Sequence, residues 1–194
     1  ILISINSRQL GPNLKLHEPN SMNNSDIKVL VTRKLPIEVE QRLQSAYEVT
    51  LNTTDQPMSK AELIVAMSHF DILISTVSDP LDEDVLQANN RRVQLIANVG
   101  VGFSNIDIKA AAALGIAVSN TPDVLTDATA DIALLLILSV TRRAYAAEKR
   151  LRDGVWQGFS LVDGLGSSMQ GKTIGIIGMG RIGQATARRA LFAF

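Results

Sequence analysis

Strand-like and helix-like segments alternate regularly along this 194-residue chain from Ile27 onward. Each strand-like run is aliphatic or β-branched and is bounded by Pro, Gly, Asn or Asp. Strands that alternate with helices over short connections build right-handed βαβ units and a mostly parallel sheet covered on both faces. We therefore predict an α/β fold with strands at 28–32, 47–51, 71–76, 93–97, 116–119 and 172–177, and helices at 37–45, 59–67, 82–88 and 107–114.

The segment 123–153 interrupts this rhythm with one long helical pattern that is apolar over 132–140 and is stopped by Gly154. A helix this apolar must be covered on most sides, which predicts a connection between two domains or a subunit contact. We place a domain boundary near Asn120, with one domain over 27–119 and the start of a second over 120–194. Residues 1–26, rich in Asn and Ser, are predicted to be an arm or loop.

Composition excludes several functional classes. The 19 basic and 19 acidic residues give a net charge of zero, so the protein has no overall positive potential that would attract nucleic acid or an anionic membrane. Without cysteine there is no disulfide, thiolate zinc site or cysteine nucleophile, and His17 and His69 lie too far apart to suggest a metal site. The apolar run 132–138 is far shorter than the roughly 20 residues that span a bilayer. We expect a cytoplasmic protein without a metal.

The most specific motif is Gly178-Met-Gly180-Arg-Ile-Gly183, which lies between the apolar run 172–177 and a helical pattern over 184–194. Gly178 permits a tight turn, Gly180 lets the backbone approach a diphosphate, and Gly183 allows close packing of helix on strand. The N–H groups at the start of the helix then face the anion. The motif predicts dinucleotide binding; the alternative is a glycine-rich turn with a structural role only.

A second glycine pair, Gly100 and Gly102, follows the predicted strand 93–97. Open α/β sheets bind ligands just outside the carboxyl ends of their strands, and backbone N–H groups there can hold a carboxylate. An ordinary strand-to-loop turn is the alternative. We expect Asp82 to stabilise a helix N-terminus, His69 to end a helix, and Arg188 and Arg189 to face solvent.

Three stretches, 98–107, 119–131 and 171–183, resemble the D-isomer-specific 2-hydroxyacid dehydrogenases, and the middle one is most similar to the glyoxylate/hydroxypyruvate reductase branch. The resemblance implies a flavodoxin-like substrate domain over 27–119, an incomplete Rossmann-type NAD(P)-binding domain from 120, and a homodimer through 123–153. It also implies that Val99 and Gly100 meet the substrate, that Thr126 approaches the nicotinamide, and that Gly178, Met179, Gly180, Arg181, Ile182 and Gly183 hold the cofactor diphosphate.

The family's reaction is hydride transfer from NAD(P)H to a 2-keto acid, assisted by an arginine, a glutamate and a histidine that follow the glycine motif. None of the three maps onto these 194 residues. The acidic residue that binds the cofactor ribose would also fall near or beyond Phe194. We therefore expect the natural chain to continue past Phe194 and to reduce glyoxylate or hydroxypyruvate with NAD or NADP as cofactor. The 194 residues alone are expected to be inactive.

Three alternatives stay open. The enzyme could prefer another 2-hydroxy acid, such as phosphoglycerate or lactate. It could instead resemble the corepressor branch of the same family, which senses nucleotides and binds proteins. A short, non-catalytic chain is the third, although the apolar face of helix 184–194 would then meet solvent.

Overall fold

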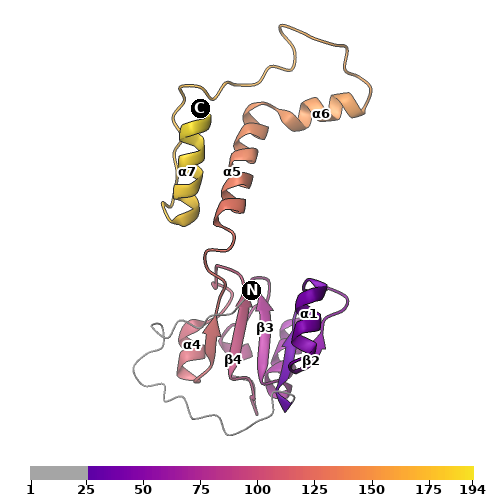
Figure 1. The fold of residues 1–194 in the computed structure, drawn as a ribbon, viewed down its shortest axis with the longest axis vertical. Helices are drawn as coiled ribbons and strands as arrows, with labels where there is room; N and C mark the ends of the chain where they lie inside the picture. Colours follow the sequence, from indigo (N-terminus) through magenta and orange to yellow (C-terminus); the bar gives the residue numbers. More distant parts are fainter. Residues whose placement is uncertain (1–25) are drawn as a thin grey trace. The chain divides into compact units, whose positions relative to one another are not determined.

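The computed structural model describes residues 26–194, which divide into two compact units between Pro122 and Asp123 (Figure 1). The first unit is built on a five-stranded parallel sheet of order β2-β1-β3-β4-β5. Its strands are β1 (Lys28–Val31), β2 (Glu48–Leu51), β3 (Ile72–Thr76), β4 (Leu95–Val99) and β5 (Ala117–Ser119). Its helices are α1 (Ile37–Gln44), α2 (Lys60–His69), α3 (Glu83–Leu86) and α4 (Ile108–Ala113).

Helices cover both faces of this sheet because its central strands are apolar on both sides. In β3, Leu73 joins the cluster beneath α2, α3 and α4, whereas the next residue, Ile74, joins the cluster on the side of α1. The register places Leu73 beside Leu30 of β1 and Ile96 of β4, so three buried side chains continue the same layer. The predicted α/β fold is confirmed, with five of the six strands and all four short helices at the expected places.

Polar side chains fix two helix ends, and the role of Asp82 is the one that the sequence predicted. Asp82 caps α3 by accepting a hydrogen bond from the Val85 N–H at 3.2 Å, and Asp107 caps α4 in the same way from Ala110 at 2.9 Å. After α4, Gly115 has φ +71°, a conformation that glycine adopts without strain. His69 is the last residue of α2, as expected.

The second unit contains α5 (Thr126–Thr141), α6 (Ala144–Arg152) and α7 (Arg181–Ala193). The single long helix expected over 123–153 is wrong, because the chain breaks between α5 and α6 at Arg143, which has φ +54°. The carbonyl of Thr141 accepts a hydrogen bond from Ser167 N–H at 2.8 Å instead of continuing the helical ladder. The segment around Gly166 passes so closely that an added Cβ would lie 2.6 Å from that carbonyl oxygen. A tertiary contact therefore divides the helix.

The strand expected at 172–177 is also not formed. These residues run without a ladder partner, and the side chain of Ile177 is fully exposed. A parallel strand needs a neighbour for its N–H and C=O groups, and residues 123–194 contain no other strand. The incomplete Rossmann-type domain expected from residue 120 therefore forms no sheet within the described residues.

Helices α5 and α7 lie side by side (Figure 1) and are joined by charge as well as by small side chains. Arg189 donates to Asp131 at 2.6 Å and to Asp127 at 3.0 Å. The expectation that Arg189 faces solvent is wrong, because it reaches across to two carboxylates one turn apart on α5. Within residues 26–194, no helix is long and apolar enough to cross a membrane.

Candidate functional site

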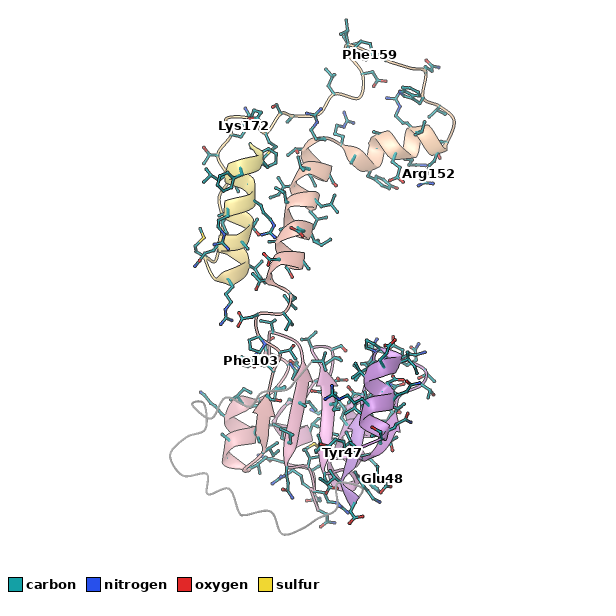
Figure 2. All side chains as sticks on the ribbon, in the orientation of Figure 1. Tyr47, Glu48, Phe103, Arg152, Phe159 and Lys172 are labelled. Atoms are coloured by element: carbon teal, nitrogen blue, oxygen red, sulfur yellow. The ribbon has the colours of Figure 1, made fainter. Side chains whose placement is uncertain are left out.

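The carboxyl ends of β1, β3 and β4 meet at one edge of the sheet in the first unit, because the strands are parallel. Figure 2 shows Phe103, in the loop after β4, at this edge, whereas Tyr47 and Glu48 at the start of β2 lie towards the opposite one. The loops that follow the three strands bring together the polar side chains described below. This edge is where ligands bind in open α/β sheets.

Asp79 ties the loops after β1 and β3 together. Its side chain is fully buried, and its Oδ2 accepts hydrogen bonds from the Thr32 hydroxyl at 2.6 Å and from the Thr76 N–H at 2.7 Å. Asn105, in the loop after β4, donates from Nδ2 to the carbonyls of Thr76 at 3.1 Å and Asp79 at 3.0 Å. The loops after β3 and β4 are therefore held in one fixed arrangement by buried polar groups.

Arg33 extends this bracing to the loop after β2. Its Nε donates to Asp55 at 3.0 Å, and its Nη1 donates to the Ser78 hydroxyl at 3.1 Å. The same Asp55 oxygen accepts from the backbone N–H of Lys34 at 3.0 Å. The hydrogen bonds from the Arg33 guanidinium and from this N–H hold the pKa of Asp55 below its ordinary value. Three of the loops at this edge are thus joined by one guanidinium.

The glycine loop after β4, residues 99–102, turns its carbonyls inward. Asn98 is buried and donates to the carbonyl of Gly102 at 3.0 Å, Asn120 donates to that of Val101 at 2.9 Å, and the Thr121 N–H donates to that of Gly100 at 2.9 Å. By contrast, the backbone N–H groups of Val101 and Gly102 have no acceptor within residues 26–194. A loop with satisfied carbonyls and free N–H donors is suited to bind an anion such as a carboxylate.

The sequence prediction named Val99 and Gly100 in this loop. Val99 is the last residue of β4 and is 41% exposed, while the N–H of Gly100 donates to the Asn98 carbonyl at 3.0 Å. Val99 and Gly100 thus lead into the loop, and their contact with a substrate stays a prediction. Of the residues beside them, Val101 and Gly102 have N–H groups without an acceptor within residues 26–194. The amides of Asn98, just before the loop, and of Asn120, just after β5, were the available signal, although their partners could not be predicted from the sequence.

In the second unit, the glycine motif leads into α7. Gly178 has φ +92°, which favours glycine, and Gly180 precedes the first residue of the helix. A Cβ on Gly183 would overlap the Gly178 carbonyl oxygen, whereas a Cβ on Gly180 would meet no atom within 4 Å. The turn is therefore closely packed between Gly178 and Gly183 and open at Gly180. An open glycine backbone beside the free N–H groups of a helix start fits the diphosphate of a dinucleotide.

The remaining residues predicted to bind the cofactor lie around this turn and at the start of α5. Arg181, the first residue of α7, pairs with Asp123 at 2.7 Å, and Met179 is exposed. Thr126 is the first residue of α5. Within residues 26–194, no group of three or more His, Asp or Glu side chains is arranged to hold a metal ion.

Comparisons with known proteins agree with this architecture. Residues 29–188 match the family described as D-isomer specific 2-hydroxyacid dehydrogenase, catalytic domain. A glyoxylate reductase from Thermococcus onnurineus is 41% identical over 167 residues, which cover 84% of this chain and 50% of that protein. A glycerate dehydrogenase from Hyphomicrobium methylovorum is 36% identical over 163 residues, covering 84% of this chain and 51% of that protein.

Among solved structures, an NADPH-dependent glyoxylate/hydroxypyruvate reductase from Sinorhizobium meliloti, in complex with NADP and malonate, is similar at a TM-score of 0.69 and 35% identity. The match covers 87% of this chain and 51% of that one. The chain thus spans about half the length of the relatives that it matches. With a family match over residues 29–188 and a five-stranded sheet of the expected type, the chain belongs to the NAD(P)-dependent D-isomer specific 2-hydroxyacid dehydrogenase family.

Proposed function

We propose that this protein reduces a small 2-keto acid, glyoxylate or hydroxypyruvate, to the D-2-hydroxy acid with NAD(P)H. The observation that carries the proposal is the glycine loop after β4, which offers the free N–H groups of Val101 and Gly102 beside satisfied carbonyls. The curated relatives named above, a glyoxylate reductase and a glycerate dehydrogenase, support a small 2-hydroxy or 2-keto acid as the substrate class.

In this proposal the loop 99–102 receives the substrate carboxylate. The backbone of Val99 and Gly100 would meet the substrate, and the N–H groups of Val101 and Gly102 would donate to its carboxylate oxygens. Backbone donors that are already in position need no rearrangement when the charge arrives, which favours binding in a fixed orientation. Asp79 and Asn105 keep the loop in place through the hydrogen bonds described above.

We assign residues 27–119 to the substrate domain and residues 120–194 to the start of the coenzyme domain. Gly178, Gly180, Arg181 and Gly183 would hold the diphosphate of NAD(P), which supplies the hydride when bound. The first turn of α7 contributes N–H donors and the positive end of its dipole, while the paired Asp123 restrains Arg181 beside them. Met179 and Ile182 complete this turn, and Thr126 would lie towards the nicotinamide end.

We further propose that the 194-residue polypeptide by itself has no turnover. Within residues 26–194 the histidine is His69, which is the last residue of α2. It lies at the amino edge of the sheet, where its Nδ1 is 2.8 Å from the Val65 carbonyl oxygen. It is therefore remote from the glycine loop and cannot serve as the acid that protonates the forming alkoxide. The arginine and glutamate implied by the family resemblance have no match in these residues either.

We also propose that the protein is a homodimer through the region around α5 and α6. Ile132, Leu135, Leu136 and Val140 of α5 are each more than half exposed within the chain. The segment 155–165 adds further exposed apolar side chains, among them Trp156 and Phe159 (Figure 2). Apolar surface of this extent favours burial against a second copy. Light scattering on the polypeptide encoded by the gene tests this, and a monomer at micromolar concentration would contradict it.

The proposed activity is tested by following NADH and NADPH oxidation by the polypeptide encoded by the gene. We expect oxidation that depends on glyoxylate or hydroxypyruvate, with D-glycerate as the product from hydroxypyruvate. Faster turnover of pyruvate or phosphohydroxypyruvate would keep the reaction but change the substrate. Failure to oxidise either coenzyme with any of these acids, together with capture of a protein partner, would favour the nucleotide-sensing alternative.

A further inference from the structure

Met179 lies inside the glycine turn before α7, and its thioether is open to solvent. Its side chain is 57% exposed, whereas Met67 is fully buried and Met58 and Met169 are half-buried. These 194 residues contain no cysteine, so no thiol in them competes with the thioethers for an oxidant. Within the part of the chain that the structure describes, Met179 is therefore the sulfur that a dissolved oxidant reaches most easily.

The backbone around Met179 is held in place, so its side chain stays beside the turn. Gly178, with φ +92°, precedes it, and the carbonyl of Met179 accepts a hydrogen bond from Gln184 Nε2 at 3.1 Å. On the other side, a Cβ on Gly180 would meet no atom within 4 Å. The thioether is thus attached one residue before the open glycine backbone to which we assign the coenzyme diphosphate.

We propose that Met179 is a modification site at which hydrogen peroxide controls binding of the coenzyme. Peroxide transfers one oxygen atom to the sulfur: the O–O bond breaks, an S=O bond forms, and the second oxygen leaves as water with both protons. The sulfur loses two electrons and the peroxide gains them, so no further reactant is needed. Methionine sulfoxide reductases reverse the step.

Oxidation replaces an apolar thioether by a polar sulfoxide whose oxygen carries a negative partial charge. The inference rests on the proposed function, because an effect on the coenzyme needs the diphosphate to lie on this turn. The sulfoxide oxygen repels the diphosphate and competes with it for the N–H groups at the start of α7. We therefore expect the sulfoxide to weaken coenzyme binding about fivefold, which is the effect of losing one hydrogen bond.

The site is tested by peptide mapping of the polypeptide encoded by the gene after treatment with hydrogen peroxide. Trypsin places each of the described methionines in a peptide of its own, and that of Met179 is 173–181. We expect 173–181 to gain an oxygen atom before the peptides of Met58 and Met169, while that of Met67 stays unmodified. If any of these other peptides gained oxygen first, the inference would be overturned.

The effect on the coenzyme is measured by NADPH fluorescence before treatment, after removal of the peroxide, and again after the sulfoxide reductases have acted. We expect the Kd to rise about fivefold and then to return to its starting value. Met179→Leu has no thioether at this position, so its Kd should be the same before and after peroxide. Met169→Leu is the matched control, and its Kd should respond as that of the wild type does. Equal responses of Met179→Leu and the wild type would contradict the proposal.

These results separate the inference from the function on which it rests. If NADPH binds with the same Kd after Met179 is fully oxidised, control by peroxide is refuted and the coenzyme site stands. If the untreated wild type binds neither NADPH nor NADH, the proposed function is refuted and control of coenzyme binding falls with it. A reversible rise in Kd that Met179→Leu abolishes supports both.

Discussion

Replacing Asp79 by alanine tests the hydrogen-bond network beneath the glycine loop. The substitution removes the acceptor of the part-buried Thr76 N–H and of the buried Thr32 hydroxyl. The hydroxyl still has the Ile74 carbonyl at 3.2 Å, so its loss is small, whereas the N–H is left without a partner. A part-buried donor left without a partner costs about 1–3 kcal/mol, which is the destabilisation we expect.

Urea unfolding followed by circular dichroism at pH 7 measures this cost. Asp84→Ala is the matched control, because Asp84 is also an aspartate near the edge of this unit but pairs only with Lys60 at an exposed site. Exposed pairs contribute little, so we expect the control to unfold close to the wild-type midpoint. If Asp79→Ala lost less than about 1 kcal/mol, the buried network would not be holding the loops, and the argument for a rigid site would fail.

Three further predictions concern the cofactor turn, an acidic side chain and the glycine loop. Gly183→Ala forces a Cβ into the Gly178 carbonyl and should abolish NADPH binding measured by fluorescence, whereas Gly175→Ala, which meets no atom within 4 Å, should retain it. Because the pKa of Asp55 is lower in the folded state, its contribution to stability is present above the unfolded pKa of about 3.9 and is lost as the pH falls through the folded pKa. Asp55→Asn should therefore flatten the acid limb of the stability profile, and an unchanged limb would refute the Arg33 pairing. Asn98→Ala removes the donor that holds the Gly102 carbonyl, so this carbonyl oxygen can turn towards the substrate carboxylate and repel it. We expect the KM for glyoxylate to rise at least tenfold, with less effect on kcat. An unchanged KM would show that Asn98 does not support the carboxylate site.

Much of the first unit could be predicted because its signals are local. Buried strands can be recognised in the sequence as runs of aliphatic residues. Residues that start or end helices, such as Asp107 and Gly115, act on neighbours within a few positions. The regular alternation then leaves few ways to arrange the strands. The sheet and its helices therefore follow from patterns that lie within each segment.

The errors arose where a distant part of the chain decides the local structure. The break between α5 and α6 depends on Ser167, 26 positions beyond Thr141, and no periodicity in 123–153 reveals it. The run 172–177 has the composition of a strand but no neighbouring strand within 123–194 to pair with. A strand is a property of a sheet, so composition alone does not make one.

The hydrogen bonds inside the glycine loop could not be predicted for the same reason. The glycines at 100 and 102 are visible in the sequence, but which N–H groups stay free depends on the carbonyls that Asn98, Asn120 and Thr121 engage. Asn120 reaches its partner across 19 positions. Sequence patterns located the loop, and only the fold shows which of its carbonyls are engaged.

The role of that loop is tested most directly by titrating the 15N-labelled polypeptide encoded by the gene with oxalate, an unreactive mimic of glyoxylate, in the presence of NADP. The account predicts that, within the first unit, the amide resonances of Val101 and Gly102 shift most and saturate together. The amide of Gly154, which lies in the other unit, serves as the internal reference. A saturable titration in which Val101 and Gly102 stay unshifted while other amides move would contradict the carboxylate site.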